Sequence, residues 1–282
     1  MSAPGDLTAE DHDRGAADRR LVYPVLSRRA GGLSIGVNLN PGKECNWACV
    51  YCEVDGLVRG APGPVDLEVL ERELDGTLAE AAAGRWTAGG QPAPVRDVSI
   101  AGDGEPTLSP QFAGAVDVCA RLREAHGLAP GAGLVTITNG SRLHVPEVAD
   151  GVRRLGAAGG ELWFKLDGGT PAARGLVNQV EVGDARVVEN LAAASAACPT
   201  WVQCMVLAVD GEGPTREDVD ARVELVRRAR DLGADPAGVV VYGLARPSMQ
   251  PDGHRLRPLE AHALEAIGRR FEALDLPVRL VV

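Results

Sequence analysis

Short apolar segments alternate with longer amphipathic segments along most of this chain. The apolar segments are rich in Val, Ile and Leu, which predicts buried β-strands. We expect these strands at residues 33–39, 95–102, 134–138, 161–166, 200–209 and 238–244. In the amphipathic segments apolar residues recur three and four positions apart, as at Leu67, Leu70 and Leu74, which predicts α-helices. We expect the helices at residues 67–81, 110–127, 145–157, 184–197, 215–233 and 258–274, and a seventh strand at 277–282.

Six strand-then-helix units predict a parallel sheet with right-handed crossovers. Eight such units would close a full barrel, so six predict an α/β fold with an incomplete (β/α)6 barrel of the TIM type. A doubly wound open sheet is the alternative, because periodicity alone does not separate the two. Residues 1–20 are polar and are expected to form a mobile tail. Residues 21–282 are expected to form one core domain that ends in the extra strand.

Unusual polar sequences follow five of the predicted strands. They are NPGKECNWACVYC, GDGEPT, TNG, KLDGGT and GLARPS, after strands 1, 2, 3, 4 and 6. In both candidate folds, the loops after the carboxyl ends of parallel strands carry the reactive groups. We therefore expect these five loops to converge on one face of the sheet.

The composition is that of a globular protein, with 45% hydrophobic and 24% charged residues. A net charge of −10 argues against unspecific nucleic-acid binding, although a local patch could still hold a specific RNA. Neither a signal-peptide core nor an apolar run long enough to cross a membrane occurs, so a cytoplasmic protein is expected. Only two lysines, Lys43 and Lys165, stand among the 29 basic residues, and both fall near the unusual loops.

Three of the six cysteines, Cys45, Cys49 and Cys52, form a C-x3-C-x2-C motif. A structural zinc site needs four ligands, and the sequence contains no second close cysteine pair and no paired histidines. Three thiolates can instead hold three irons of a [4Fe–4S] cluster and leave the fourth iron open. A chance group of structural cysteines is the third interpretation. The remaining cysteines are scattered, and a core position is expected for Cys119, whereas a second cluster on Cys198 and Cys204 is not favoured.

The segment CNWACVYC resembles the cluster-binding motif of the radical S-adenosylmethionine (SAM) enzymes. The resemblance implies that the amino and carboxylate groups of SAM chelate the open iron of a [4Fe–4S] cluster on Cys45, Cys49 and Cys52. It also implies reductive cleavage of SAM to a 5′-deoxyadenosyl radical. Tyr51 matches the family position that lies near the adenine.

The segment GDGEPTL resembles the second motif of this family, usually Gly-Gly-Glu, which contacts the SAM amino group. The resemblance assigns Gly104 and Glu105 to this contact, whereas Asp103 replaces the usual first glycine. A glycine lets the backbone approach a ligand, and a carboxylate accepts from an ammonium group. Replacing Glu105 with Gln is therefore expected to weaken SAM binding and to leave folding almost unchanged.

Two shorter motifs match family positions that bind ribose or methionine groups. They contribute Asn139, from TNG, and Lys165 and Asp167, from KLD. Each motif is also an ordinary turn sequence. Gln203 and Arg246 are further candidates, for which a buried filler and a surface arginine are the simpler interpretations.

Together these motifs are similar to the branch of the superfamily that includes the wyosine-forming tRNA enzymes. We expect a radical SAM enzyme that acts on an unidentified substrate and receives its electron from a donor such as flavodoxin or ferredoxin. A tRNA-modifying enzyme is one alternative. A non-catalytic iron–sulfur or zinc protein is the alternative from another class.

Overall fold

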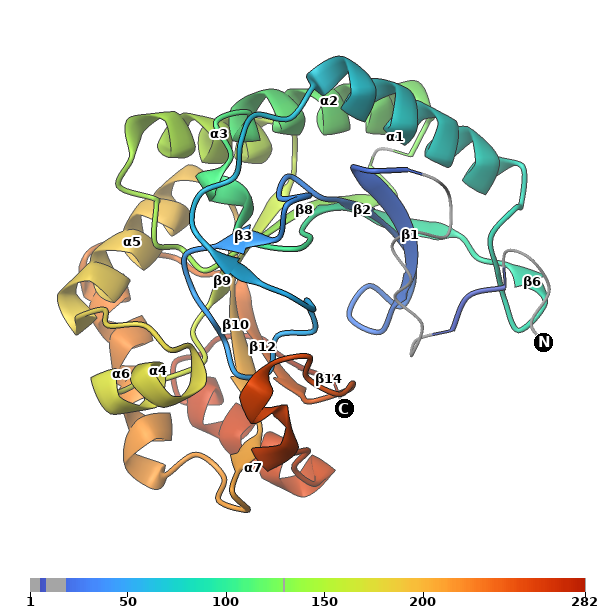
Figure 1. The fold of residues 1–282 in the computed structure, drawn as a ribbon. Helices are drawn as coiled ribbons and strands as arrows, with labels where there is room; N and C mark the ends of the chain where they lie inside the picture. Colours follow the sequence, from blue (N-terminus) through green and yellow to red (C-terminus); the bar gives the residue numbers. More distant parts are fainter. Residues whose placement is uncertain (1–5, 9–18, 129, 282) are drawn as a thin grey trace.

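The computed structural model describes residues 6–8, 19–128 and 130–281. Its main feature is a curved sheet of eight strands, shown in Figure 1. In spatial order the strands are β1 (Val22–Ser27), β2 (Gly32–Val37), β7 (Val95–Ile100), β8 (Gly133–Thr138), β9 (Glu161–Lys165), β10 (Thr200–Val206), β12 (Gly238–Gly243) and β14 (Val278–Val281). All neighbours from β2 to β14 are parallel. The sheet is a half-barrel, as the six predicted units require.

Helices cover the convex side of this sheet (Figure 1). They are α1 (Leu67–Ala82), α2 (Phe112–Ala125), α3 (Pro146–Ala157), α4 (Pro171–Val177), α5 (Asp184–Ala197), α6 (Arg216–Asp231) and α7 (Ala261–Glu272). Short elements complete the described chain: β3 (Glu44–Cys45), β4 (Val58–Arg59), β5 (Thr87–Ala88), β6 (Gln91–Pro92), β11 (Ala208–Val209), β13 (Leu256–Arg257) and the 3-10 helices η1 (Pro106–Leu108) and η2 (Pro251–Arg255). None of the described helices has the length and hydropathy that a membrane span requires.

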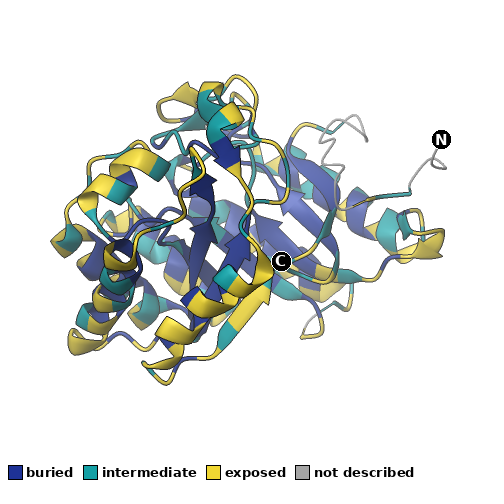
Figure 2. Cartoon of the chain, turned by 90° about the horizontal axis from the view of Figure 1, so that it is seen from below, coloured by how far each residue is buried: buried dark blue, intermediate teal, exposed yellow. Residues whose placement is uncertain are grey.

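The alternation of side chains along the strands separates an apolar core from a polar interior. In β2, Leu33, Ile35 and Val37 lie in the core between the sheet and the helices. Ser34 and Gly36 point the opposite way and line a cavity on the concave side. Because successive side chains of a strand alternate between its faces, each strand supplies both layers. Figure 2 shows the result, with buried strands inside helices whose outer faces are exposed.

The structure confirms the predicted strands and helices, although α7 begins at Ala261 rather than at Pro258. Besides the short elements, it adds one strand and one helix that the sequence pattern did not indicate. Strand β1 pairs antiparallel with β2 at the edge of the sheet, where its Pro24 is tolerated because an edge strand has an unpaired side. Helix α4 is too short to show a clear period. The predicted start of α2 is also corrected. The helix begins at Phe112, because residues 106–108 first form η1 and Ser109 accepts a hydrogen bond from Gln111 N before the helix starts (3.3 Å).

Most of the predicted N-terminal tail, residues 1–5 and 9–18, lies outside the described residues. Within residues 6–8, Leu7 N donates to the Thr87 carbonyl oxygen at 2.8 Å, beside a bridge between Asp6 and Thr87. This short segment therefore contacts the strand pair β5–β6 at the edge of the fold.

Candidate functional site

A cavity of about 270 Å³ opens at the carboxyl ends of the parallel strands. Its lining includes residues from all five of the unusual loops: Cys45, Cys49, Tyr51, Cys52, Gly104, Glu105, Asn139, Lys165 and Arg246. The predicted convergence of these loops is thus confirmed. Parallel strands bring it about because their carboxyl ends share one edge of the sheet.

The loop of the three cysteines follows β2 and is held by the end of α4. Ala48 N donates to the Asn178 carbonyl oxygen at 3.2 Å, and Val50 N donates to that of Val177 at 2.9 Å. The side-chain amide of Asn178 also donates to Cys49 Sγ at 3.2 Å. All three thiols are free of disulfides and only partly buried. The loop therefore presents a thiol that already has a hydrogen-bond donor.

Burial favours the protonated form of the Cys45 and Cys49 thiols in the ligand-free chain. It raises the pKa of Cys45 to about 12, with the Glu105 carboxylate adding to the rise. It raises the pKa of Cys49 to about 11, although the Lys165 ammonium group opposes this. A bound metal centre displaces such protons, because its positive charge favours the thiolate.

In the described part of the chain, no three His, Cys, Asp or Glu side chains are grouped closely enough to surround one metal ion. A mononuclear site of the zinc type is therefore not preformed there. The requirement for a cluster is different, since three thiolates that bind three different irons need not converge on one point.

Glu105 is a buried carboxylate, and it is 3% exposed. Its Oε1 accepts from Thr107 N at 3.1 Å, from Thr107 Oγ1 at 2.6 Å and from Thr138 Oγ1 at 2.6 Å. Its Oε2 accepts from Asn139 N at 2.7 Å. Burial raises the pKa of Glu105, and these hydrogen bonds oppose the rise. The carboxylate therefore joins the loops after β7 and β8, a structural role that a turn motif does not indicate.

Gly104 packs closely against the cysteine loop. A Cβ atom at this position would lie 1.9 Å from the Glu44 carbonyl oxygen, next to Cys45. Only glycine fits this contact. Asp103, which replaces the usual glycine, pairs with Asn38: the Asn38 side-chain amide donates to its carboxylate at 2.6 Å, and Asp103 N donates back at 3.1 Å.

Asn139 connects the end of β8 to the cysteine loop. Its side-chain amide donates to Asn46 Oδ1 at 2.8 Å, and its Oδ1 accepts from Ser141 N at 3.0 Å. The residue is buried. Asn139 therefore fixes the position of the segment between Cys45 and Cys49.

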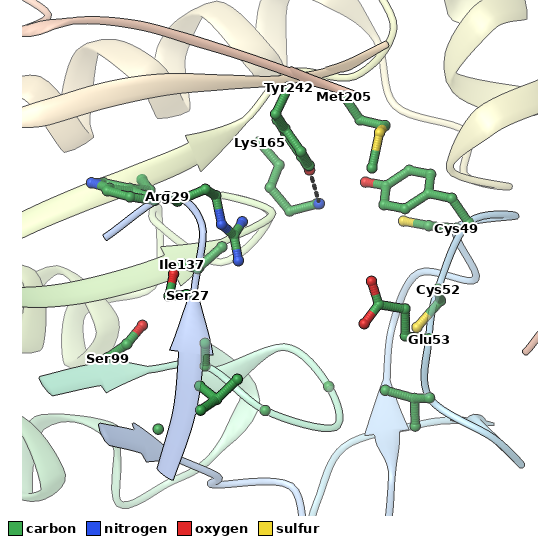
Figure 3. A pocket seen from close by; sticks show the side chains of 18 of the residues that line it. Ser27, Arg29, Cys49, Cys52, Glu53, Ser99, Ile137, Lys165, Met205 and Tyr242 are labelled. Carbon is green, nitrogen blue, oxygen red and sulfur yellow. Dashed lines mark hydrogen bonds between the residues drawn. The ribbon is translucent and has the colours of Figure 1, made fainter. Parts of the chain in front are cut away.

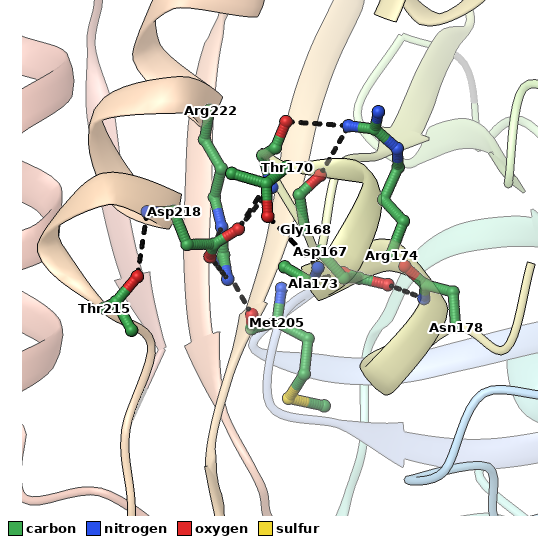
Figure 4. Close-up of polar contacts among 11 residues, drawn as sticks. Asp167, Gly168, Thr170, Ala173, Arg174, Asn178, Met205, Thr215, Asp218 and Arg222 are labelled. Atoms are coloured by element: carbon green, nitrogen blue, oxygen red, sulfur yellow. Dashed lines mark hydrogen bonds and ion pairs between the residues drawn. The ribbon is translucent and has the colours of Figure 1, made fainter. Parts of the chain in front are cut away.

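Asp167 is the hub of the polar network after β9, and its side chain is fully buried. Its carboxylate accepts from the Tyr51 hydroxyl. It also accepts from Asn178 Nδ2 at 2.9 Å and from Met205 N at 2.9 Å (Figure 4). Lys165 Nζ lies 3.5 Å from the same carboxylate. Unlike Lys165, Asp167 does not line the main cavity but a smaller one beside it.

Lys165 is held between two aromatic rings and this carboxylate. Its ammonium group lies 4.9 Å from the centre of the Tyr51 ring and 3.4 Å from the Tyr242 hydroxyl. Burial favours a lower pKa, but Asp167 and Tyr242 outweigh it and raise the pKa of Lys165. The protonated, cationic form of Lys165 is therefore favoured at the wall of the cavity.

The loop after β9 is fixed from behind by α6. Asp218 accepts from Gly169 N at 2.6 Å and from Thr170 N at 3.2 Å, and it is paired with Arg222 (Figure 4). A Cβ atom at Gly169 would lie 2.2 Å from the Asp218 carbonyl oxygen. Gly169 thus allows close packing of the loop against α6, whereas Gly168 packs against α4, where a Cβ atom would lie 2.7 Å from Arg174 N.

The remaining candidates differ in their placement. Arg246 lines the cavity and donates to Glu53 at 2.7 Å. Gln203 is fully buried in β10, and neither of its side-chain amide atoms has a hydrogen-bond partner among the described residues. The other cysteines lie in the apolar core. They are Cys119, Cys198 and Cys204, and none of them lines the main cavity.

Sequence reasoning missed several residues of the site. Asn178 is the most important, because it contacts both Cys49 and Asp167. Asn40 is another: its side-chain amide donates to the Glu44 and Glu105 carbonyl oxygens at 2.9 and 3.2 Å. The pair of asparagines in VNLNPG, directly before the cysteines, was a usable signal for Asn40. No comparable signal marked Asn178.

The comparisons with known proteins agree with this architecture. A model of the radical SAM superfamily matches residues 39–226, which is more than half of the chain. The chain therefore belongs to the radical SAM superfamily. Enzymes of this superfamily use SAM and an iron–sulfur cluster.

Two curated relatives come from two strains of Helicobacter pylori, and both are called "UPF0026 protein". Each is 30% identical to this chain over 135 residues, a match that covers 47% of this chain and 38% of the relative. The match thus spans well under half of the relatives' length.

A solved structure described as histidine-tagged anSMEcpe with bound AdoMet, which is SAM, has a similar fold. The TM-score is 0.51, and the similarity covers 88% of this chain and 63% of the other. The sequences are 14% identical, so this likeness concerns the fold alone.

Proposed function

We propose that this chain cleaves SAM reductively with a [4Fe–4S] cluster held by Cys45, Cys49 and Cys52, and that the 5′-deoxyadenosyl radical acts on a second substrate. One observation carries the proposal: in a radical SAM chain, these thiols line the same cavity as Glu105 and Lys165. When bound, the cluster supplies the electron for the cleavage and an open iron for SAM.

The cysteine loop suits a cluster in its donor chemistry. The Asn178 amide already points an N–H group at Cys49 Sγ, where it would stabilise a thiolate. Val177 and Asn178 also fix the loop backbone. We infer that α4 orients the loop for cluster binding.

The SAM site of this proposal uses the other walls of the cavity. Glu105 Oε2 accepts one hydrogen bond within the described chain, from Asn139 N. It thus retains acceptor capacity for the SAM ammonium group. Lys165 supplies a cation beside the cavity, Gly104 allows close approach of the backbone, and Tyr51 lies on the adenine side.

Asp167 and Asn139 have supporting parts in this proposal. The oxygens of Asp167 are occupied by Tyr51, Asn178 and Met205. We therefore assign Asp167 to positioning Tyr51 and Lys165 rather than to direct contact with SAM. Asn139 likewise holds the cysteine loop, and its backbone orients Glu105.

We assign the catalytic unit to residues 21–282 and the protein to the cytoplasm. A reductant is needed, and a flavodoxin or ferredoxin would supply the electron. The second substrate is left unnamed. A tRNA substrate of the wyosine type receives no specific support from a chain with a net charge of −10.

Anaerobic reconstitution with iron and sulfide tests this function. Iron and sulfide should bind at about four each per chain, and reduction with SAM should yield 5′-deoxyadenosine and methionine. Cys49→Ala should abolish both results, whereas the matched control Cys119→Ala should keep them, because Cys119 lies in the apolar core. Stoichiometric zinc without sulfide, or a loaded cluster that does not cleave SAM, would refute the proposal.

A further inference from the structure

The cavity continues beyond the residues that the proposed chemistry uses. Figure 3 shows Cys49, Cys52 and Glu53 on one side, and Arg29, Ser27 and Ser99 on the opposite side. These opposite residues come from the β1–β2 hairpin and from the inner face of β7. Nothing in the proposed binding of the cluster or of SAM employs them.

Arg29 extends from the hairpin into this part of the cavity (Figure 3). Its guanidinium carbon lies 5.7 Å from the centre of the Trp163 ring and 5.6 Å from that of Tyr242. Cation–π contacts of this kind hold a guanidinium group in place but leave its N–H donors unused.

No carboxylate of the described chain forms an ion pair with Arg29, and none of its N–H groups has a hydrogen-bond partner there. The other cations of the cavity differ. Lys165 is paired with Asp167, and Arg246 is paired with Glu53. Asp97 also lines the cavity and interacts electrostatically with Arg29. Burial raises the pKa of Asp97, whereas a hydrogen bond from the Ser34 hydroxyl and the charge of Arg29 oppose the rise.

We propose that Arg29 binds an anionic group, a carboxylate or a phosphate, of the second substrate. This inference rests on the proposed function, because it treats the cavity as the reaction chamber. A guanidinium group presents parallel N–H donors that match the two oxygens of either anion. The hydroxyls of Ser27 and Ser99 line the same side of the cavity as Arg29 (Figure 3), and the rings of Trp163 and Tyr242 offer an apolar wall for the rest of the substrate.

The hairpin gives this assignment a structural reason. Strand β1 runs antiparallel to β2, so its last residue, Ser27, pairs with the first residue of β2, Gly32. The turn between them places Arg29 beside β9 and β12, on which Trp163 and Tyr242 stand. The side chain thereby lies in the cavity, on the side opposite Cys49 and Cys52 (Figure 3).

The test uses reconstituted protein with SAM and three probes: inorganic phosphate, benzoate and the neutral analogue benzamide. Binding of each probe is measured by calorimetry for the wild type, for Arg29→Gln and for Arg72→Gln. The last variant is the control, because it removes the same charge from an exposed position on α1. We expect phosphate or benzoate to bind to the wild type and to Arg72→Gln, and to bind about ten- to a hundred-fold more weakly to Arg29→Gln. Benzamide should bind weakly to all three.

The outcomes separate this proposal from the proposed function. Preference for benzoate would identify a carboxylate substrate, and preference for phosphate a phosphorylated one. SAM affinity and substrate-free SAM cleavage should be equal in the wild type and Arg29→Gln. Anion binding that does not depend on Arg29 would overturn the inference, and so would a loss of SAM affinity in Arg29→Gln, which would assign Arg29 to the SAM carboxylate. Failure of SAM cleavage in every protein, with Arg29-dependent anion binding intact, would instead refute the proposed function alone.

Discussion

Replacing Glu105 with Gln should affect both the fold and SAM binding, and the two effects can be worked out separately. The carboxylate accepts four hydrogen bonds within the chain, three at Oε1 and one at Oε2. In the variant, the amide oxygen can replace Oε1. The NH2 group then occupies the position of Oε2 and faces Asn139 N, so that two donors meet.

An unsatisfied buried donor costs about 1–3 kcal/mol. Removal of a buried charge offsets part of this cost, because burial disfavours the ionised form of Glu105. We therefore expect the free energy of unfolding to fall by about 1–2 kcal/mol. SAM loses a charge-assisted hydrogen bond, which corresponds to about ten- to a hundred-fold weaker binding. The sequence-based expectation of unchanged folding is thus revised.

Thr138→Val is the matched control. It removes one donor to Oε1 and the acceptor of Gly140 N but leaves the carboxylate charged, so it should cost about 1–3 kcal/mol of stability and preserve SAM affinity. Urea unfolding followed by circular dichroism gives the first quantity, and anaerobic calorimetry with SAM gives the second. Wild-type SAM affinity in Glu105→Gln would mean that the carboxylate is purely structural. An equal loss of SAM affinity in both variants would mean that the loop geometry, not the charge, binds SAM.

Three further substitutions test other parts of the site. Asn178→Leu removes the N–H donor to Cys49 Sγ, so the midpoint potential of the reconstituted cluster should become more negative; an unchanged potential in a redox titration would contradict this role. Gln203→Met removes two unpaired buried amide atoms, so the ligand-free chain should gain about 1 kcal/mol of stability, and a lower melting temperature would show that these atoms have a partner. Asp97→Asn tests the pKa of Asp97, which burial raises above its unfolded value. The folded wild type then binds more protons than the unfolded chain between the two pKa values, so its stability relative to the variant should decline as pH rises through that window. A stability difference between the two that is independent of pH would refute the raised pKa.

Local patterns in the sequence were enough to predict the parallel strands and all the longer helices except α4, but they did not separate the half-barrel from a doubly wound open sheet. In β2, apolar side chains recur at every second position, and in α1 leucines recur every three or four residues. Parallel strands then carry their following loops to one edge, so the meeting of Cys49, Glu105 and Lys165 followed from topology alone.

The tertiary structure decided what each of these residues does for its neighbours. Glu105 and Asn139 are as consistent with solvated turns as with a buried network, because the burial of a side chain depends on segments far away in the chain. Asn178 contacts Cys49 although the two residues are 129 positions apart in the chain. Arg29 reaches the rings of Trp163 and Tyr242 because it follows the edge strand β1, which the sequence pattern did not indicate. Hydrogen bonds and charge pairs between distant loops have no period and no fixed spacing. They arise only when the half-barrel brings the ends of its strands together.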